Sequence, residues 1–523
     1  MPTAATAMIA TPHHLASTIG ADVLREGGTA VDAAIAANAA MTVLLPDQTS
    51  IGGDCFFQIW EPGSDAPTGF NGSGRAPAAT SADQVRAAGY DAMPRRGPWT
   101  VTVPGTIDAW FAAHERYGEL PIGRLLAPAS NLAREGFEIS ARLSAAIAVE
   151  VNDLAANPAA AAIFLDNGVA PPPGFRLVNP GLANSLDLIG AAGRDAFYTG
   201  AIADAILAVA GTGAGGWMTE NDLANHAGID VDPVATTYRG ATVWELPPNS
   251  QGITAQLGLA MMERETFGAS WDDPAWLHVQ IEAKKRAFAI RDQYLGDPGR
   301  MTVAVDDILA PATIDALWAD FDPGAPSAGQ ATMPGDTIYL AIIDGNGLAV
   351  SLIQSIYVGF GSGLVAGDTG VVLQNRGSYF SLVPGHPNEL GGGRLPLHTL
   401  MPAMIEMPGR GRGAFGTQGG DAQAQVHMQM VSHLVDDGAP PAEAVGRPRW
   451  LAGDARREPY AVTVEADMPW PAIEGLQALG HQVRQVEPGW PHAGYAQMVL
   501  RDEATGELSG AADPRAEGSV EAV

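Results

Sequence analysis

Two short apolar runs on either side of a turn constrain the fold of this chain more than any other feature of its sequence. The first run covers residues 337–343, the second covers residues 348–355, and a Gly-Asn-Gly turn at residues 345–347 separates them. Runs rich in β-branched residues that flank such a turn are typical of a β-hairpin. The hairpin places Thr337 at the head of its first strand and Ser355 near the far end of its second.

Thr337 combines a hydroxyl group with a position just after an irregular segment. A threonine that opens a strand is most often structural. If the bond before Thr337 were cut, however, this residue would hold a hydroxyl nucleophile together with a free α-amine that can act as its base. Residues 304–332 are rich in proline breaks, so we expect an exposed linker that leads to this position.

The composition predicts a folded chain with many short elements. The 523 residues are enough for one large domain or a few ordinary ones, and 46% of them are hydrophobic while 17% are charged. The 63 glycines and 39 prolines predict many turns. Within residues 15–45, for example, Gly27-Gly28 is expected to end one helix and Thr29 to cap the next.

The net charge of the chain limits the kinds of partner that it can bind. The formal net charge is -29, which disfavours binding to nucleic acid or to an anionic membrane, and solubility is its simplest role. The first residues lack the pattern of a signal peptide, and no apolar run reaches the length of a transmembrane helix. We therefore expect a cytoplasmic protein without nucleic-acid or membrane partners.

Motifs for cofactors and metals are weak in this sequence. The single cysteine, Cys55, cannot form an intramolecular disulfide and is expected to be a buried thiol. Residues 411–416 match GxGxxG, but no βαβ unit surrounds them, so a hairpin turn is favoured over a dinucleotide site. HExxH and paired CxxC motifs do not occur. We therefore expect no metal and no cofactor.

A glycine-rich turn at residues 416–421 leads into a predicted helix near residues 423–435. Two backbone amides in such a turn, at the start of a helix, can form an oxyanion hole.

Taken together, short motifs spread over nearly the whole chain resemble the γ-glutamyltransferase family of N-terminal nucleophile hydrolases. Each motif alone is weak, but they occur in the order typical of the family. They are Gly27–Ala34, Gly52-Gly53-Asp54, Val103–Thr106, Tyr238-Arg239-Gly240, Tyr294–Pro298, Gly335-Asp336-Thr337, Phe360–Gly363, Asn375, Gly419-Gly420 and Gly510–Arg515.

The resemblance implies an α/β (α+β) fold, a four-layer αββα sandwich. It also implies self-cleavage before Thr337 into a large subunit, residues 1–336, and a small subunit, residues 337–523, which together form one intertwined catalytic unit. Thr337 would be both the cleavage point and the nucleophile, with Ser355 as a supporting hydroxyl. Gly419 and Gly420 match the oxyanion-hole pair of the family.

The substrate-binding positions depart from the family pattern. The arginine that binds an α-carboxylate in the family is Ser73 here, and Arg75 lies two residues further on. The aspartate that binds the α-ammonium group is replaced by Tyr379, and a glutamine three residues earlier is replaced by Arg376. The remaining substitutions are His398-Thr399 for a serine pair and Tyr357 for an asparagine.

These changes suggest an acidic substrate without a free ammonium group. The alternative is that the arginines only pair with structural carboxylates.

Our first hypothesis is a self-processing amide hydrolase with a threonine acyl-enzyme. It would act on a small carboxylate-bearing substrate such as an oxamate-like monoamide or an N-acyl compound. The second is a γ-glutamyl hydrolase or transferase of glutathione metabolism, and the third is an unprocessed binding protein. The expected partners are a small-molecule amide and the two subunits of one precursor, which leaves a homo-oligomer of the processed heterodimer open.

Overall fold

Two sheets packed face to face form the centre of the computed structural model, which describes residues 5–329, 332–333, 335–454 and 458–523. The first sheet has seven strands. In spatial order they are β18 (Ser519–Ala522), β1 (Met8–Thr11), β9 (Asp336–Ile343), β10 (Ala349–Tyr357), β2 (Asp54–Trp60), β3 (Thr68–Gly72) and β6 (Ile229–Val231).

The second sheet has six strands, and all of its pairings are antiparallel. In spatial order they are β17 (Leu508–Ala512), β16 (Ala496–Arg501), β12 (Gly411–Thr417), β11 (Ala403–Met407), β8 (Ala241–Glu245) and β7 (Val234–Tyr238). Two small sheets lie outside this pair: β13 (Trp450–Asp454), β14 (Glu458–Glu465) and β15 (Val483–Val486), and β4 (Phe137–Glu138) with β5 (Arg176–Leu177).

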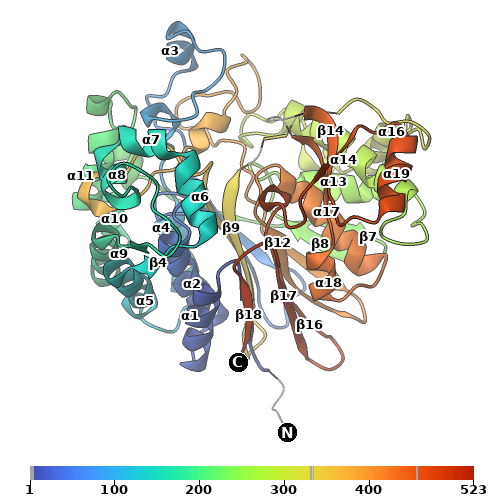
Figure 1. Cartoon of the computed structure of the whole chain (residues 1–523), viewed down its shortest axis with the longest axis horizontal. Helices are drawn as coiled ribbons and strands as arrows, with labels where there is room; N and C mark the ends of the chain where they lie inside the picture. The colour runs from blue at the N-terminus through green and yellow to red at the C-terminus, as the bar shows by residue number, and fades with distance from the viewer. Residues whose placement is uncertain (1–4, 330–331, 334, 455–457) are drawn as a thin grey trace.

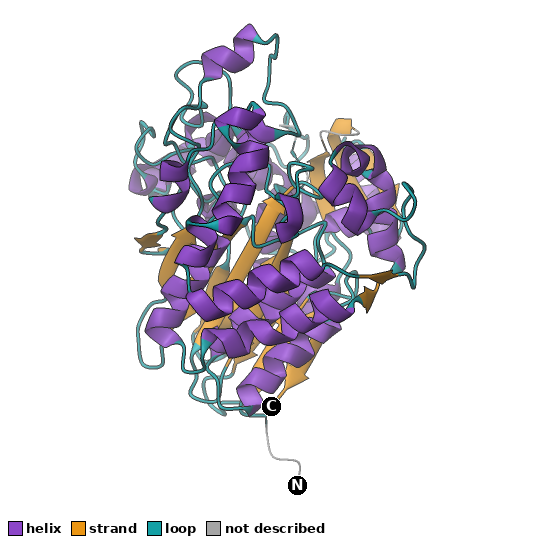
Figure 2. Ribbon diagram, turned by 90° about the vertical axis from the view of Figure 1, so that its left-hand side faces the viewer, coloured by secondary structure: helices purple, strands orange, loops and turns teal. Residues whose placement is uncertain are grey.

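Helices cover the outer face of each large sheet. On the first sheet, Figure 1 shows them at the left, and Figure 2 shows them in front of the strands. This part of the chain contains α1 (His14–Arg25), α2 (Ala30–Leu44), α3 (Ala82–Ala87), α4 (Thr106–Tyr117), α5 (Ile122–Glu135), α6 (Ala141–Val149), α7 (Val151–Ala156), α8 (Pro158–Phe164), α9 (Pro180–Ala192), α10 (Asp195–Tyr198), α11 (Ala201–Ala210) and α12 (Glu220–Ala224).

The helices on the side of the second sheet lie at the right of Figure 1. They are α13 (Gly252–Met262), α14 (Pro274–Tyr294), α15 (Val305–Ile308), α16 (Pro311–Trp318), α17 (Ala422–Val435), α18 (Pro441–Gly446) and α19 (Trp470–Ala478). Short 3-10 helices occur at Pro98–Thr100, Thr212–Ala214, Gly367–Thr369, Arg376–Tyr379 and Pro491–Ala493.

Three apolar cores separate the four layers. One lies between the first sheet and its helices, and a second lies between the second sheet and its helices. The third, which includes Phe56, Tyr339 and Met404, lies between the two sheets. This arrangement confirms the predicted αββα sandwich, because each sheet buries one face against helices and the other against its partner sheet.

The predicted hairpin is confirmed. Strands β9 and β10 pair antiparallel, and Gly347 takes a φ of 88°, which a glycine adopts readily. The carboxylate of Asp344 accepts hydrogen bonds from the backbone N–H groups of Asn346 and Leu348, so local side-chain chemistry closes the turn.

The predicted helix pair is also confirmed. Thr29 caps α2, and Thr29 and Asp32 form a complete capping box. The prediction of an exposed linker was only partly right, because α15 and α16 form within residues 304–332 and Trp318 is buried. The glycines of residues 411–416 lie in strand β12 and not in a turn. Within the described ranges, no helix is both long and apolar enough to cross a membrane.

Candidate active site

Thr337 lies in the second position of β9, next to Ser355 of β10, and its side chain is buried. Thr337 Oγ1 donates a hydrogen bond to Ser355 Oγ over 3.2 Å. Ser355 Oγ in turn donates to the backbone oxygen of Asp336 over 2.5 Å and accepts the N–H of Tyr357 over 2.7 Å. The second hydroxyl thus links the predicted nucleophile to the carbonyl of the peptide bond that is predicted to be cut.

The glycine turn, by which we mean Gly419-Gly420, lies between β12 and α17. Gly419 and Gly420 have φ values of 131° and 60°, which favour glycine. A Cβ added to Gly335 would approach Gly420 Cα to 3.2 Å, so the turn runs beside the residue that precedes Asp336. This proximity agrees with the oxyanion-hole prediction, which stays a prediction.

Arg376 is a buried cation with unused hydrogen-bonding capacity. Arg376 is 1% exposed, and its Nη2 donates to Thr399 Oγ1 over 2.9 Å. Nε and Nη1 are buried and have no hydrogen-bond partner among the described residues. The guanidinium stacks 3.9 Å from the ring centre of Tyr357 and lies 5.4 Å from that of Tyr379. Burial lowers the pKa of Arg376 from its ordinary value.

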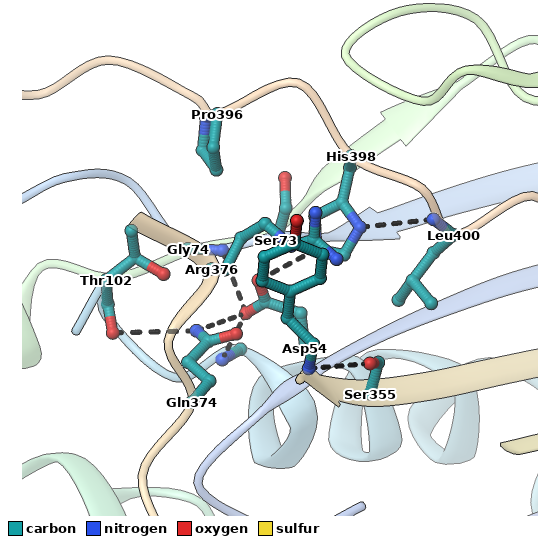
Figure 3. Close-up of polar contacts among 12 residues, drawn as sticks. Asp54, Ser73, Gly74, Thr102, Ser355, Gln374, Arg376, Pro396, His398 and Leu400 are labelled. Atoms are coloured by element: carbon teal, nitrogen blue, oxygen red, sulfur yellow. Dashed lines mark hydrogen bonds and ion pairs between the residues drawn. The ribbon is translucent and has the colours of Figure 1, made fainter. Parts of the chain in front are cut away.

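Beside this arginine lies a buried Asp–His pair (Figure 3). Asp54 Oδ2 lies 3.1 Å from His398 Nε2, and Asp54 Oδ1 accepts the side-chain amide of Gln374 over 3.0 Å. His398 Nδ1 accepts the N–H of Leu400, so Nε2 carries the proton that is donated to Asp54. Burial lowers the pKa of His398 well below its ordinary value and raises the pKa of Asp54 to about 7. Both ring nitrogens of His398 are therefore engaged inside the protein.

Tyr379 reaches a carboxylate that the sequence analysis did not single out. Its hydroxyl donates to Asp421 Oδ1 over 2.6 Å. Asp421 also forms a buried ion pair with Arg291, whose Nη1 lies 2.9 Å from Oδ1. Tyr379 occupies the position of an aspartate in the family. Its hydroxyl nevertheless contacts a carboxylate, that of Asp421. No spacing rule connects Arg291, Tyr379 and Asp421, because they come from three separate segments.

Arg75 differs from Arg376 in its surroundings. It is exposed, and its Nη1 donates to the backbone oxygen of Gly393. The six predicted substrate-binding residues thus include a close group, in which Tyr357 and Tyr379 flank Arg376 and Thr399 accepts its hydrogen bond. The structure does not bring Arg75 into that contact group.

A cleft of about 640 Å³ opens beside Asp336. Its walls include Ala141, Ala145 and Val149 of α6, together with Gln418, which precedes the glycine turn. The residue before the predicted cleavage point therefore faces a space that a small molecule can enter.

Among the described residues, one cluster has the composition of a metal site: His278, Glu282 and His481. Glu282 already pairs with Lys285 at 2.7 Å and with Arg286 at 2.8 Å. Two cationic side chains next to the only carboxylate disfavour a metal ion at this position.

The four-layer αββα sandwich is the fold of the N-terminal nucleophile hydrolases. The model of the gamma-glutamyltranspeptidase family matches residues 16–523. The chain belongs to the gamma-glutamyltranspeptidase family, whose proenzymes are amide hydrolases or transferases.

Individual relatives agree with this assignment. A protein named glutathione hydrolase-like YwrD proenzyme, from Bacillus subtilis (strain 168), is 38% identical over 516 residues and is matched over 98% of both chains. The oxamate amidohydrolase proenzyme of Klebsiella pneumoniae subsp. pneumoniae is 36% identical over 521 residues, again with 98% of both chains covered. The crystal structure of a cephalosporin acylase from Bacillus halodurans superposes with a TM-score of 0.93 at 36% identity, covering 99% of this chain and 96% of that one.

Proposed function

We propose that this chain cleaves itself before Thr337 and then hydrolyses a small carboxylate-bearing amide through an acyl-enzyme on Thr337. The observation that carries the proposal is the hydrogen-bonded series from Thr337 Oγ1 through Ser355 Oγ to the Asp336 carbonyl oxygen. In this series Ser355 orients the nucleophile and polarises the carbonyl that it attacks.

This geometry supports self-cleavage by the following steps. Thr337 Oγ1 attacks the carbonyl carbon of Asp336, and the hydroxyl proton passes to the backbone nitrogen of Thr337. The C–N bond breaks, and an ester joins Asp336 to Thr337 Oγ1. Water then hydrolyses the ester, which leaves a carboxylate on Asp336 and both a free hydroxyl and a free α-amine on Thr337.

Turnover repeats this chemistry with an external amide. The α-amine of Thr337 accepts the hydroxyl proton while Oγ1 attacks the substrate carbonyl, and the N–H groups of Gly419 and Gly420 are proposed to stabilise the negative oxygen. The amine product leaves with a proton, and water releases the acyl group as a carboxylate.

The buried position of Arg376 favours a substrate that carries a carboxylate group. A buried guanidinium with two unsatisfied nitrogens is costly, and a carboxylate ligand would supply both charge and hydrogen-bond acceptors. Thr399 holds the guanidinium through Nη2, so that Nε and Nη1 are the groups left for a ligand. Among relatives, the name of oxamate amidohydrolase refers to a small amide of this chemical kind.

Self-cleavage is tested by intact mass spectrometry of the purified protein and of Thr337→Ala. The expected products of the wild type are residues 1–336 and 337–523, because Oγ1 is the only atom of Thr337 that can attack the preceding carbonyl. Thr337→Ala should remain one chain without amidase activity. Cleavage at another bond, or in the variant, would show that the nucleophile is wrongly assigned; a single wild-type chain would support the unprocessed binding protein.

A γ-glutamyl hydrolase or transferase is the second candidate. The Asp421 carboxylate at the end of the Tyr379 ring favours it, since an α-ammonium group needs a nearby acid. The relative named glutathione hydrolase-like also points in this direction. Release of aniline from a γ-glutamyl anilide, compared with release from the glutaryl anilide that lacks the ammonium group, separates the two candidates. We expect the glutaryl compound to react faster.

A further inference from the structure

Asp421, directly after the glycine turn, binds the backbone of the chain's own segment ahead of Thr337. Its Oδ2 accepts the N–H of Met333 over 2.7 Å, and its backbone N–H donates to the oxygen of Met333 over 3.1 Å. Asp421 is 1% exposed, whereas Met333 is 47% exposed. The two contacts therefore recognise the main chain of residue 333 and not its side chain.

Asp421 is held rigidly for this task. Arg291 binds both of its carboxylate oxygens, with Nη1 2.9 Å from Oδ1 and Nη2 3.2 Å from Oδ2. Tyr379 donates to Oδ1. Gln251 accepts from Arg291 over 3.0 Å and donates to the backbone oxygen of Gly420 over 3.0 Å. This network joins Asp421 to the glycine turn, so a ligand on Asp421 lies close to the predicted reaction centre.

Cleavage before Thr337 makes Asp336 a C-terminal residue. Met333 is then close to a chain end that can move away, and Asp421 can bind another ligand in its place. The N–H and carbonyl oxygen of one residue, as Met333 presents them, have the same spacing as the N–H and one carboxyl oxygen of an N-acylated α-amino acid. We infer that Asp421 of the processed enzyme binds these two groups of a substrate that is an N-acylated α-amino acid, whose side-chain amide is hydrolysed. This inference rests on the proposed function, which supplies both the cleavage and the acyl-enzyme.

Two charges favour a neutral N–H over a free ammonium group. Arg291 already neutralises Asp421, so an added ammonium would be buried beside a guanidinium without a full counter-charge. Arg376, which contacts the same Tyr379 ring, would repel an ammonium as well and attract the α-carboxylate. A substrate with an acylated nitrogen and a free carboxylate satisfies both sites.

The test uses processed wild-type enzyme and three side-chain anilides of five-carbon dicarboxylic acids, which differ only in the group on the α-carbon: acetamido, acetoxy or hydrogen. Each hydrolysis consumes one water, releases aniline and leaves a side-chain carboxylate. The acetamido compound should show a kcat/KM about 10- to 100-fold higher than the acetoxy compound, because only the former donates an N–H to a charged acceptor. The acetoxy compound matches it in size, so the ratio isolates that hydrogen bond.

Equal values for the acetamido and acetoxy compounds would overturn the inference and leave the proposed function intact. Failure to cleave any of the three, by a chain that mass spectrometry shows to be processed at Thr337, would instead refute the proposed substrate class. Asp421→Asn should lower the ratio of acetamido to acetoxy turnover at least severalfold. If this variant does not fold or process, the wild-type ratio still decides the question.

Discussion

Two arginines looked equivalent as carboxylate-binding residues in the sequence, and burial separates them. Arg376 is 1% exposed and stacks on Tyr357, and two of its nitrogens have no hydrogen-bond partner in the part of the chain that the structure describes. Arg75 is exposed and already donates to a backbone oxygen. A guanidinium in water gains little from one more partner, whereas a buried one gains both a counter-charge and acceptors.

Replacing the buried arginine tests this difference. Arg376→Gln should raise the KM of a carboxylate-bearing amide about 10- to 100-fold, because a charge-assisted hydrogen bond is lost, while kcat changes less. Arg75→Gln is the matched control and should leave both constants near wild type. Steady-state kinetics on a neutral amide should show no comparable effect of Arg376→Gln. Equal losses on both substrates would mean that Arg376 has only a structural role.

At the scale of elements, the glycine turn between β12 and α17 depends on conformations that other residues resist. Gly419 has a φ of 131°, and an added Cβ would approach the Cβ of Ala422 to 3.2 Å. A side chain here must shift the turn and, with it, the backbone N–H groups that are proposed to bind the oxyanion.

Gly419→Ala should therefore lower kcat, and loss of one aligned donor is worth about 100- to 1000-fold. The control is Gly438→Ala, which also places a Cβ at a positive φ, 68°, but away from the turn and with no described atom within 4 Å of the added Cβ. Both variants are first checked for processing by mass and for folding by circular dichroism. Unchanged turnover in folded, processed Gly419→Ala would remove Gly419 from the site.

Helix α14 carries both lysines of the chain, and one of them is deeply buried. Lys284 is 1% exposed, and its Nζ donates to the backbone oxygen of Ala452 over 2.7 Å. Burial, with the nearby charge of Arg291, lowers the pKa of Lys284 to about 7. Between that value and its ordinary pKa of 10.5, the unfolded chain holds a proton that the folded chain does not. The free energy of unfolding should therefore rise with pH in this range.

Lys284→Met removes this contribution. The difference between the free energies of unfolding, parent minus variant, should therefore increase as pH rises from about 7 to 9.5. One proton accounts for at most about 1.4 kcal/mol per pH unit. Urea unfolding in the Thr337→Ala background avoids complications from a two-chain protein. Parallel pH profiles of the two proteins would contradict the assignment of a neutral lysine.

At the scale of the whole molecule, each large sheet takes strands from both sides of residue 336. In the first sheet β1, from before the cut, pairs with β9, which begins at Asp336. In the second sheet β8, from before the cut, pairs with β11, from after it. The core between the sheets likewise mixes the two parts, with Phe56 and Trp244 packed near Tyr339 and Met404. Cutting one bond removes none of these contacts.

The two predicted fragments should accordingly stay together after cleavage. Native mass spectrometry should give one species with the summed mass of the two fragments, and a denaturing gel should resolve two bands. Separation of the fragments in dilute buffer without denaturant would contradict the intertwined unit. The same native measurement gives the number of heterodimers in the assembly.

The sequence by itself determined the features that depend on neighbouring residues. The β9–β10 hairpin follows from β-branched runs around a Gly/Asn turn, and the start of α2 follows from the capping box of Thr29 and Asp32. Resemblance to a family added the sandwich fold, because the motifs kept their order along the chain. These signals are local or are read one position at a time.

Only the tertiary structure decided which side chains meet in the site. Asp54 and His398 are 344 residues apart in the chain, and Asp421 lies 130 residues from Arg291, yet both pairs are in contact. Asp54 begins strand β2 and Arg291 lies in helix α14, whereas His398 and Asp421 lie in loops. Such pairs form because separate elements meet in the folded chain, and no periodicity or spacing encodes that meeting. Burial also leaves Arg376 with two nitrogens that have no hydrogen-bond partner among the described residues, which is the physical reason that we propose an acidic substrate.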